Sequence, residues 1–177
     1  MRNKGGGIDK MSCEQLLSWL LANREKLISS LLDGSYRPNP VMRVEIPKDN
    51  DKKRQLGIPT VVDRLVQQAI NQVLMPHYER KFSRSSFGFR PRKSCHDALH
   101  KAQKIVNEGY VYVVDLDLER FFDTVGHSKL IEILSRTIKD GRVISLIHKY
   151  LRSGVMNHGV FEMNGGVLRK DVHLVHC

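Results

Sequence analysis

The sequence predicts an α+β fold that is rich in helices and contains short antiparallel strands. Five segments carry apolar residues at helical spacing, most clearly residues 16–32 and 62–74. Residues 41–47 alternate apolar and polar side chains as a half-buried strand does, and residues 54–58 follow a polar turn as the second strand of a hairpin. Residues 110–118 also alternate and begin with aromatic and β-branched residues, which predicts a further, largely buried strand.

Capping signals mark where the helices start and stop. Three of the helices are expected to begin at capping residues, which are Ser12 with Gln15 as its capping-box partner, Thr60 and Ser94. Glycines are expected to end two of them, at Gly34 and Gly109. The helix that starts near Thr60 is expected to end near Pro76, because proline cannot donate a backbone hydrogen bond. Two more helices, over residues 130–138 and 143–151, precede a small hairpin over residues 154–163.

Composition and charge indicate an intracellular protein that meets an anionic partner. Three cysteines among 177 residues, without CxxC spacing, are typical of the reducing cytoplasm, and neither a membrane span nor a secretory signal is expected. The net charge is +10, and residues 37–104 hold 15 Lys and Arg against 6 Asp and Glu. Such a concentrated surplus is typical of a surface for phosphate backbones, although a solvated basic face would look the same.

Residues 82–94 form the most unusual loop, because aromatic and basic side chains alternate there around Gly88 and Pro91. Such a loop can stack on bases while it binds phosphates. Phe87 and Phe89 fit either stacking or anchoring of the loop equally well. The predicted RNA-binding residues are Lys52, Arg84, Arg90, Arg92 and Lys93.

Two carboxylates stand on one face at the end of the strand predicted over residues 110–118. Asp115 and Asp117 lie two residues apart, and oxygen ligands of this kind suit Mg²⁺. The alternative is that these carboxylates only end the strand and meet a nearby lysine or arginine.

Four motifs in this order closely resemble the reverse transcriptases encoded by bacterial group II introns, also called intron maturases. Residues 3–9 resemble the family's entry motif, and residues 54–67 resemble its first fingers motif. Ser86-Phe87-Gly88-Phe89-Arg90-Pro91 resembles the second fingers motif, and residues 114–127 resemble the first palm motif.

The resemblance implies a right-hand polymerase fold with fingers over residues 1–109 and a partial palm over residues 110–163. It implies RNA-directed DNA synthesis with two Mg²⁺ ions, with group II intron RNA, or an RNA template with a DNA primer, as partners in the bacterial cytoplasm. Asp117 corresponds to the first catalytic metal ligand, with the Leu118 carbonyl as another, and Asp115 to a supporting charge. The implied nucleotide contacts are Lys53, Arg54 and Arg64 at the triphosphate and Phe121 or Phe122 beneath the sugar.

The sequence departs from the family at its second palm motif. No Tyr-x-Asp-Asp sequence is present, so the chain alone is expected to lack polymerase activity. Codons for residues 167–177, shifted by two bases, permit a sequence that resembles the Pro-Gln-Gly motif, which suggests that a frameshift produced residues 164–177. Apolar surface left exposed on a partial palm would favour pairing with a second copy of the chain.

Two other functions fit parts of the sequence. A non-catalytic RNA-binding module would use the same basic loop and would not need the second palm motif. A zinc hydrolase would use His96 and His100, which lie one helical turn apart, but it requires a third ligand that the sequence does not indicate.

Overall fold

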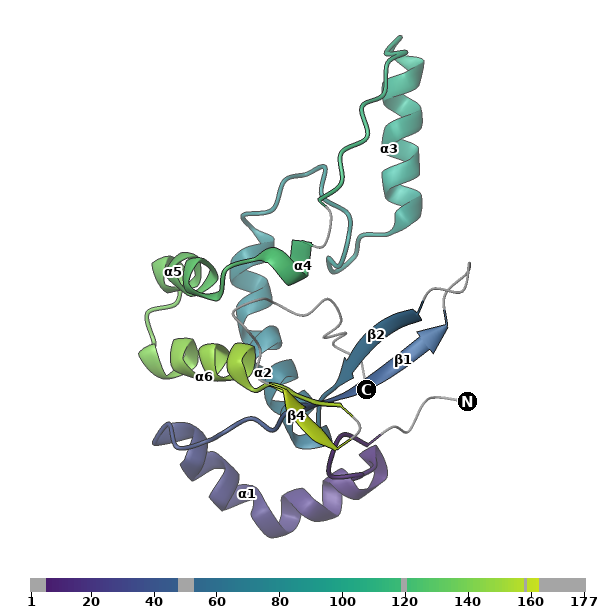
Figure 1. The fold of residues 1–177 in the computed structure, drawn as a ribbon. Helices are drawn as coiled ribbons and strands as arrows, with labels where there is room; N and C mark the ends of the chain where they lie inside the picture. Colours follow the sequence, from purple (N-terminus) through teal and green to yellow (C-terminus); the bar gives the residue numbers. More distant parts are fainter. Residues whose placement is uncertain (1–5, 48–52, 119–120, 158, 163–177) are drawn as a thin grey trace. The chain divides into compact units, whose positions relative to one another are not determined.

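The computed structural model describes residues 6–47, 53–118, 121–157 and 159–162. These residues form two compact units. The first unit contains residues 6–68 and 121–162 where they are described, and the second contains residues 69–118. The mixture of helices and a small sheet confirms the predicted α+β class (Figure 1). The two compact units do not test the predicted division into fingers (residues 1–109) and a partial palm (residues 110–163), which stays a prediction.

The first unit begins with the predicted capping box. The Ser12 N–H donates to Gln15 Oε1 at 2.9 Å, and a 3₁₀ turn (Cys13–Gln15) leads directly into α1 (Leu16–Leu32). Gly34 follows the helix with φ +74°, a conformation that glycine adopts without steric cost. Both predicted ends of α1 are therefore confirmed.

The four strands described in the first unit form one sheet in the order β2-β1-β3-β4. The predicted hairpin is confirmed as β1 (Val41–Pro47) and β2 (Lys53–Ile58), which pair antiparallel with Val44 opposite Leu56. The predicted small hairpin is confirmed as β3 (Val155–Asn157) and β4 (Val160–Glu162). The sheet is mixed, however, because β3 adds to β1 in parallel, and such a pair needs a long connection that strand patterns do not reveal.

Helix α2 (Val61–Glu79) begins in the first unit and ends in the second. Thr60 is its N-cap, since Thr60 Oγ1 accepts the Asp63 N–H at 3.2 Å. The helix ends at Glu79, three residues after Pro76, near which its end was expected. Because proline has no backbone N–H, Pro76 removes one helical hydrogen bond, and only one further turn follows it.

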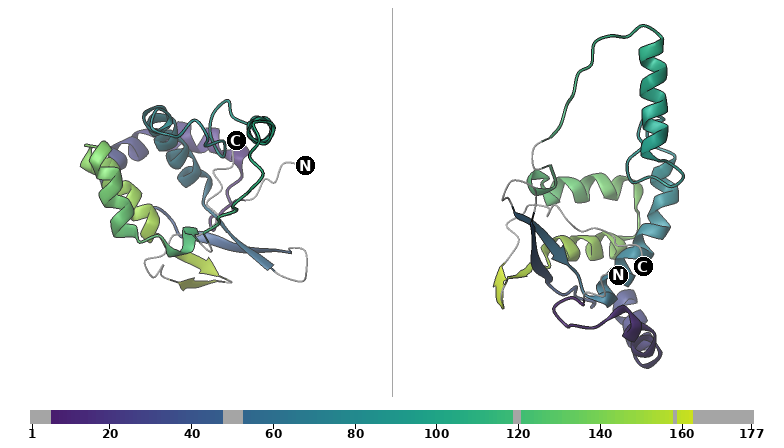
Figure 2. Two further views of the ribbon diagram at one scale, coloured as in Figure 1. Left: turned by 90° about the horizontal axis from the view of Figure 1, so that it is seen from above. Right: turned by 90° about the vertical axis from the view of Figure 1, so that its right-hand side faces the viewer.

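Two helices of the first unit lie side by side, α5 (His127–Thr137) and α6 (Gly141–Arg152), and both were predicted (Figures 1 and 2). A single turn, α4 (Phe121–Thr124), precedes them. Asp140 begins α6 by accepting the Arg142 N–H at 2.8 Å. None of the described helices combines the length and the apolar character needed to cross a membrane.

The buried residues of the described chain all belong to the first unit. The buried valines come from β1, the start of α2 and β3, and they are Val41, Val61, Val62, Val66 and Val155. The glycine-rich entry also packs here, because a Cβ on Gly7 would lie 2.7 Å from both the Cα and N atoms of Thr60. This contact places residues 6–9 against the start of α2.

The second unit contains the end of α2 and α3 (Cys95–Asn107). Ser94 caps α3 as predicted, with its Oγ accepting the Asp97 N–H at 3.2 Å. Apolar side chains of α3 such as Leu99 and Val106 are 66% and 57% exposed. Among the described residues of this unit none is buried, so α3 has no packed apolar face.

The strand predicted over residues 110–118 is wrong. These residues have no regular secondary structure, and Tyr112 and Val113 are 94% and 86% exposed. The alternating pattern describes a strand correctly only when other strands satisfy its backbone hydrogen bonds and cover its side chains. No described strand pairs with this segment.

Candidate nucleic-acid interface

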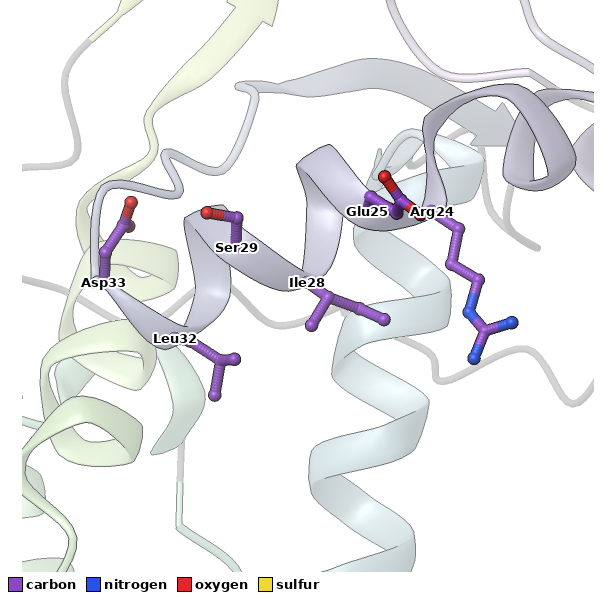
Figure 3. A pocket seen from close by; sticks show the side chains of 6 residues that line it. All are labelled: Arg24, Glu25, Ile28, Ser29, Leu32 and Asp33. Atoms are coloured by element: carbon purple, nitrogen blue, oxygen red, sulfur yellow. The ribbon is translucent and has the colours of Figure 1, made fainter.

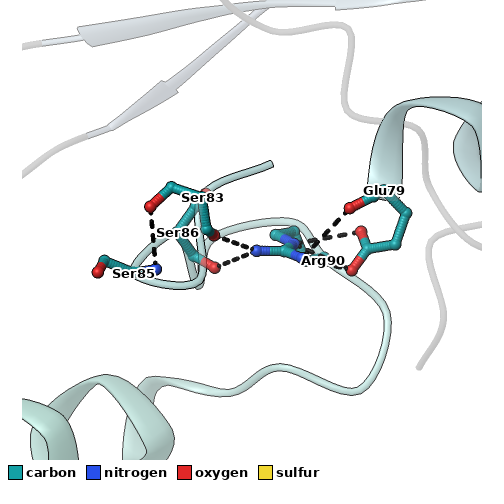
Figure 4. A network of polar contacts seen from close by, with 5 residues as sticks. All are labelled: Glu79, Ser83, Ser85, Ser86 and Arg90. Carbon is teal, nitrogen blue, oxygen red and sulfur yellow. Dashed lines mark hydrogen bonds and ion pairs between the residues drawn. The ribbon is translucent and has the colours of Figure 1, made fainter. Parts of the chain in front are cut away.

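The loop between α2 and α3 is held in place by Arg90. Its guanidinium contacts the Glu79 carboxylate at 2.6 Å, and Nη1 donates to the carbonyl oxygens of Ser83 at 2.6 Å and Ser86 at 2.9 Å (Figure 4). The Arg90 side chain is 8% exposed, and its hydrogen bonds lower the pKa of the Glu79 carboxyl. Arg90 was predicted to bind RNA, but its donors are already used within the loop. Its observed contacts are those of a clamp.

The aromatic residues of the loop divide between anchoring and exposure. The Arg90 guanidinium lies 5.4 Å from the Phe82 ring centre, and Lys93 Nζ lies 5.6 Å from that of half-buried Phe87. Phe89, in contrast, is 93% exposed and has φ +56°. A left-handed backbone that turns a phenylalanine into solvent is unusual, and such strain is often found at binding sites.

The other predicted RNA-binding residues of the loop have exposed side chains. Arg84, Arg92 and Lys93 all lie on the surface, and Arg92 is also left-handed, with φ +59°. Lys101 on α3 donates to Ser85 Oγ at 2.5 Å, which ties the loop to that helix. The arrangement offers exposed cations close in sequence to the almost fully exposed ring of Phe89. Lys52 lies outside the described residues.

The first unit is organised around a buried carboxylate that the sequence analysis did not single out. Asp63 is 1% exposed, and its Oδ1 accepts the Tyr36 hydroxyl at 2.7 Å. Its Oδ2 accepts the Thr60 hydroxyl at 2.6 Å, and the Asn39 backbone N–H and side-chain amide at 3.2 Å each. The Tyr150 hydroxyl approaches Oδ1 at 3.3 Å. Burial and the nearby carboxylate raise the pKa of Tyr36, so this hydroxyl keeps the proton that it donates.

Arg64, one of the predicted triphosphate contacts, directly follows Asp63 in the chain. Arg64 lies in the first turn of α2, where its N–H donates to the Thr60 carbonyl at 2.9 Å. Lys53 and Arg54 begin β2, opposite Pro47 and Ile46, and their side chains lie outside the described part. Phe121 is 46% exposed at the start of α4, and the Phe122 side chain is not described.

The predicted metal ligands do not form a metal site in the described residues. Asp115, Asp117 and Leu118 are all exposed in the extended segment. No group of three His, Cys, Asp or Glu side chains gathers anywhere in the described ranges, around Asp117 or around His96 and His100. A single exposed carboxylate does not hold Mg²⁺, which takes several oxygen ligands in octahedral geometry.

A second basic surface, which was not predicted, lies in the first unit where the turn after α1 meets the end of α6. It surrounds a pocket of about 510 Å³ whose lining includes Arg37, His148, Lys149 and Arg152 and no carboxylate. Lys149 Nζ donates to the carbonyls of Gly34 and Tyr36, which fixes the turn against α6.

Sequence signals for the missed residues differ in strength. Thr60 and Asp63 have the spacing of a capping box. This spacing predicts a role for the Asp63 carboxylate at the start of the helix, but it does not predict that the carboxylate is buried. Tyr36 and Tyr150 carry no local signal, because they meet Asp63 only in the folded chain.

Comparison with known proteins identifies the relatives of this chain. The sequence model described as "Reverse transcriptase (RNA-dependent DNA polymerase)" matches residues 46–169. The group II intron-encoded protein LtrA of Lactococcus lactis subsp. cremoris is 43% identical over 135 residues, which are 76% of this chain and 22% of LtrA. Protein YkfC of Escherichia coli K12 is 36% identical over 159 residues, which are 88% of this chain and 42% of YkfC. The chain thus spans less than half the length of either relative.

A solved structure has the same fold. A chain of the "Partial Cas6-RT-Cas1--Cas2 complex" is similar over 87% of this chain and 27% of its own length, with a TM-score of 0.54 and 22% identity.

Proposed function

This chain belongs to the reverse transcriptase family, and from that premise we propose that it supplies the RNA-contacting fingers of a group II intron-encoded protein. The observation that carries the proposal is the loop over residues 82–93, which holds Arg84, Arg92 and Lys93 exposed, close in sequence to the exposed ring of Phe89. Exposed cations neutralise phosphates, and an exposed ring stacks on an unpaired base. The ligand is structured RNA with unpaired bases, such as an intron RNA or a primer–template.

A filter-binding experiment at several salt concentrations tests this function. Replacing Arg84, Arg92 and Lys93 by alanine should lower the log–log salt slope by about 2 to 3, at ~0.7–0.9 for each phosphate contact. The matched control replaces Lys129, Arg136 and Lys139, three exposed cations of the first unit, and removes the same charge. If both triple variants change the slope equally, binding follows net charge and the loop is not the RNA surface.

Phe89→Ala should separate stacking from charge. We expect affinity for single-stranded RNA to fall roughly tenfold, since one stacked base contributes ~1–3 kcal/mol. The salt slope should not change, because the ring carries no charge. Unchanged affinity would show that Phe89 does not touch RNA.

The catalytic part of the proposal concerns Asp117 with Leu118, as the first Mg²⁺ ligands, and Lys53, Arg54, Arg64 and Phe121 or Phe122 as nucleotide contacts. Asp117 needs further carboxylates to hold two metals, and no Tyr-x-Asp-Asp sequence is present in this chain to supply them. We therefore expect primer extension with this chain, Mg²⁺ and deoxynucleotides to give no product above background. Robust extension would overturn this assignment.

A second copy of the chain is also a proposed partner. Large apolar side chains such as Leu21 on α1 are exposed in the first unit, and exposed apolar patches favour association.

A further inference from the structure

One pocket of the first unit is lined by cations from two segments that are far apart in the sequence. It has a volume of about 510 Å³ and lies between the turn after α1 and the last turn of α6. Arg37 lines it from the turn, and His148, Lys149 and Arg152 line it from the helix. Small or apolar residues complete this basic pocket, namely Gly34, Ser35 and Pro38. Among the described residues, its lining thus holds three full positive charges and no carboxylate.

A larger pocket in the same unit has a different charge pattern. It has a volume of about 750 Å³ and lies along α1, where Figure 3 shows Arg24 near Glu25 at one end and Asp33 at the other. One cation and two carboxylates therefore line it, and Ile28 and Leu32 add apolar surface. A pocket of this composition has no excess of positive charge, so it does not attract an anion. Of these two pockets, only the basic pocket suits an anionic ligand.

The exposed arginines of the basic pocket form no ion pair within the part of the chain that the structure describes. Arg37 and Arg152 are both exposed. The described ion pairs use other cations, and at the other end of α6, for example, Arg142 pairs with Asp140 at 2.9 Å. The donors of Arg37 and Arg152 are therefore available to a ligand.

Lys149 holds the two sides of the basic pocket together. Its Nζ donates to the carbonyl oxygens of Gly34 and, at 3.1 Å, of Tyr36, which fixes the turn against α6. An ammonium group has three donors, so one remains for a ligand. Hydrogen bonds from Ser35 and, to a smaller extent, the charge of Lys149 lower the pKa of the Asp33 carboxyl. This ionised carboxylate offsets at most one of the three positive charges.

Stabilisation of the helix end explains only part of this cluster. Lys149 and Arg152 lie in the last turn of α6, where positive charge interacts favourably with the helix dipole. Arg37 comes from another segment and brings a third like charge to the same pocket. Like charges held close together repel each other, and an anion bound between them removes this repulsion. The cluster is therefore most stable with an anion bound.

We propose that the basic pocket binds a phosphate of the RNA backbone. The guanidinium groups of Arg37 and Arg152 each present paired N–H donors that match two phosphate oxygens. Lys149 Nζ adds a further donor. A polyanion is favoured over a single small anion, because the net charge of +10 attracts a ligand with many negative charges. This inference rests on the proposed RNA-binding function and adds a second contact to it, in a different unit from the loop over residues 82–93.

Chemical footprinting of arginines tests the pocket in the wild-type chain. Phenylglyoxal modifies accessible guanidinium groups, and mass spectrometry of the digested chain locates the modified residues. In the free chain we expect Arg37, Arg152 and Arg24 to react, since all three are exposed. With a synthetic RNA hairpin bound, modification of Arg37 and Arg152 should fall roughly fivefold or more, because a bound phosphate occupies their donors. Arg24, which shares its pocket with two carboxylates, is the control and should react as before.

A pair of double variants measures the same contact by binding. Replacing Arg37 and Arg152 by alanine should lower the log–log salt slope for the RNA hairpin by ~0.7–0.9, the value of one phosphate contact. The matched control replaces Arg24 and Lys26, two exposed cations of α1, and removes the same charge. This control should not change the slope. Circular dichroism should be the same for both double variants, because the replaced side chains are exposed.

The possible failures are distinct. If RNA protects neither Arg37 nor Arg152, or if both double variants change the slope equally, the pocket is not an RNA contact, whereas the loop is tested by its own variants. Protection by millimolar inorganic phosphate but not by the hairpin would identify a small-anion site and overturn the RNA assignment. A wild-type chain that does not bind the hairpin at any salt concentration would overturn both the pocket and the proposed function.

Discussion

The two units of this chain are stabilised in different ways. The first surrounds buried valines and the buried Asp63 carboxylate, which joins Tyr36, Thr60 and Tyr150 from distant parts of the sequence. The second has no buried residue among those described, and its loop is held by Arg90 bound to Glu79 and by Lys101 bound to Ser85. Buried networks lose several interactions at once when one member is removed, whereas a surface clamp affects only its own loop. The units should therefore respond very differently to mutation.

The largest expected effect is in the first unit. Asp63→Ala leaves the hydroxyls of Tyr36 and Thr60 and two Asn39 donors without their acceptor in a buried site. We expect the free energy of unfolding to fall by about 3 kcal/mol or more, measured by chemical denaturation followed by circular dichroism. Asp140→Ala is the control, because it removes an exposed cap and should cost only ~1 kcal/mol. Equal losses would show that the network stabilises no more than an ordinary cap.

A smaller effect is expected at the glycine-rich entry. Gly7→Ala would place a Cβ 2.7 Å from two backbone atoms of Thr60, so the entry must move away from α2. Overpacking of this kind costs about 1 to 3 kcal/mol. Gly141→Ala is the matched control, since no atom lies within 4 Å of its added Cβ and it begins a helix. The same denaturation experiment should show this control unchanged or slightly more stable.

In the second unit the expected effect is local. Arg90→Ala removes the ion pair to Glu79 and the hydrogen bonds to Ser83 and Ser86. Amide hydrogen exchange over residues 83–93 should become faster, while protection in β1 and the start of α2 should not change. Arg84→Ala, at an exposed position of the same loop, should leave the exchange rates as they are. Loss of protection in both units after Arg90→Ala would contradict their independence.

The smallest effect is that of pH on the same clamp. Arg90 lowers the pKa of Glu79 in the folded chain, so the contribution of the pair is fully present above the ordinary glutamate pKa of about 4.3. It is lost as the pH falls through the lowered value. NMR signals of the loop amides should therefore be constant from neutral pH down to about 5 and shift only in more acidic solution. A transition near neutral pH would identify a different titrating group.

Local features of the fold were predictable from sequence, and contacts between distant residues were not. The caps at Ser12, Thr60 and Ser94 and the β1–β2 hairpin depend on residues close together in the chain. The parallel pairing of β1 with β3 and the meeting of Tyr36 with Asp63 depend on residues far apart, which no local pattern marks.

The candidate site shows the same division. The composition of the loop over residues 82–94 identified a basic, aromatic surface, but not that Arg90 would be bound to Glu79 while Phe89 is exposed. For residues 110–118 the pattern is that of a strand, but a strand also needs neighbours, and the described residues provide none.

The parallel pairing of β1 with β3 also bears on how this chain folds while it is synthesised. Tyr36 precedes β1 and Lys149 precedes β3 in the chain, and these two residues, which bond to each other, are 113 residues apart. At ~5–20 residues per second, a ribosome needs roughly 6 to 23 s to make the intervening chain. The β1–β2 hairpin can close early in that interval, since its contacts are local, but β1 cannot pair with β3 until β3 has been made. For those seconds the nascent chain has an open sheet edge at β1, and this edge is a site for chaperone binding or for misfolding.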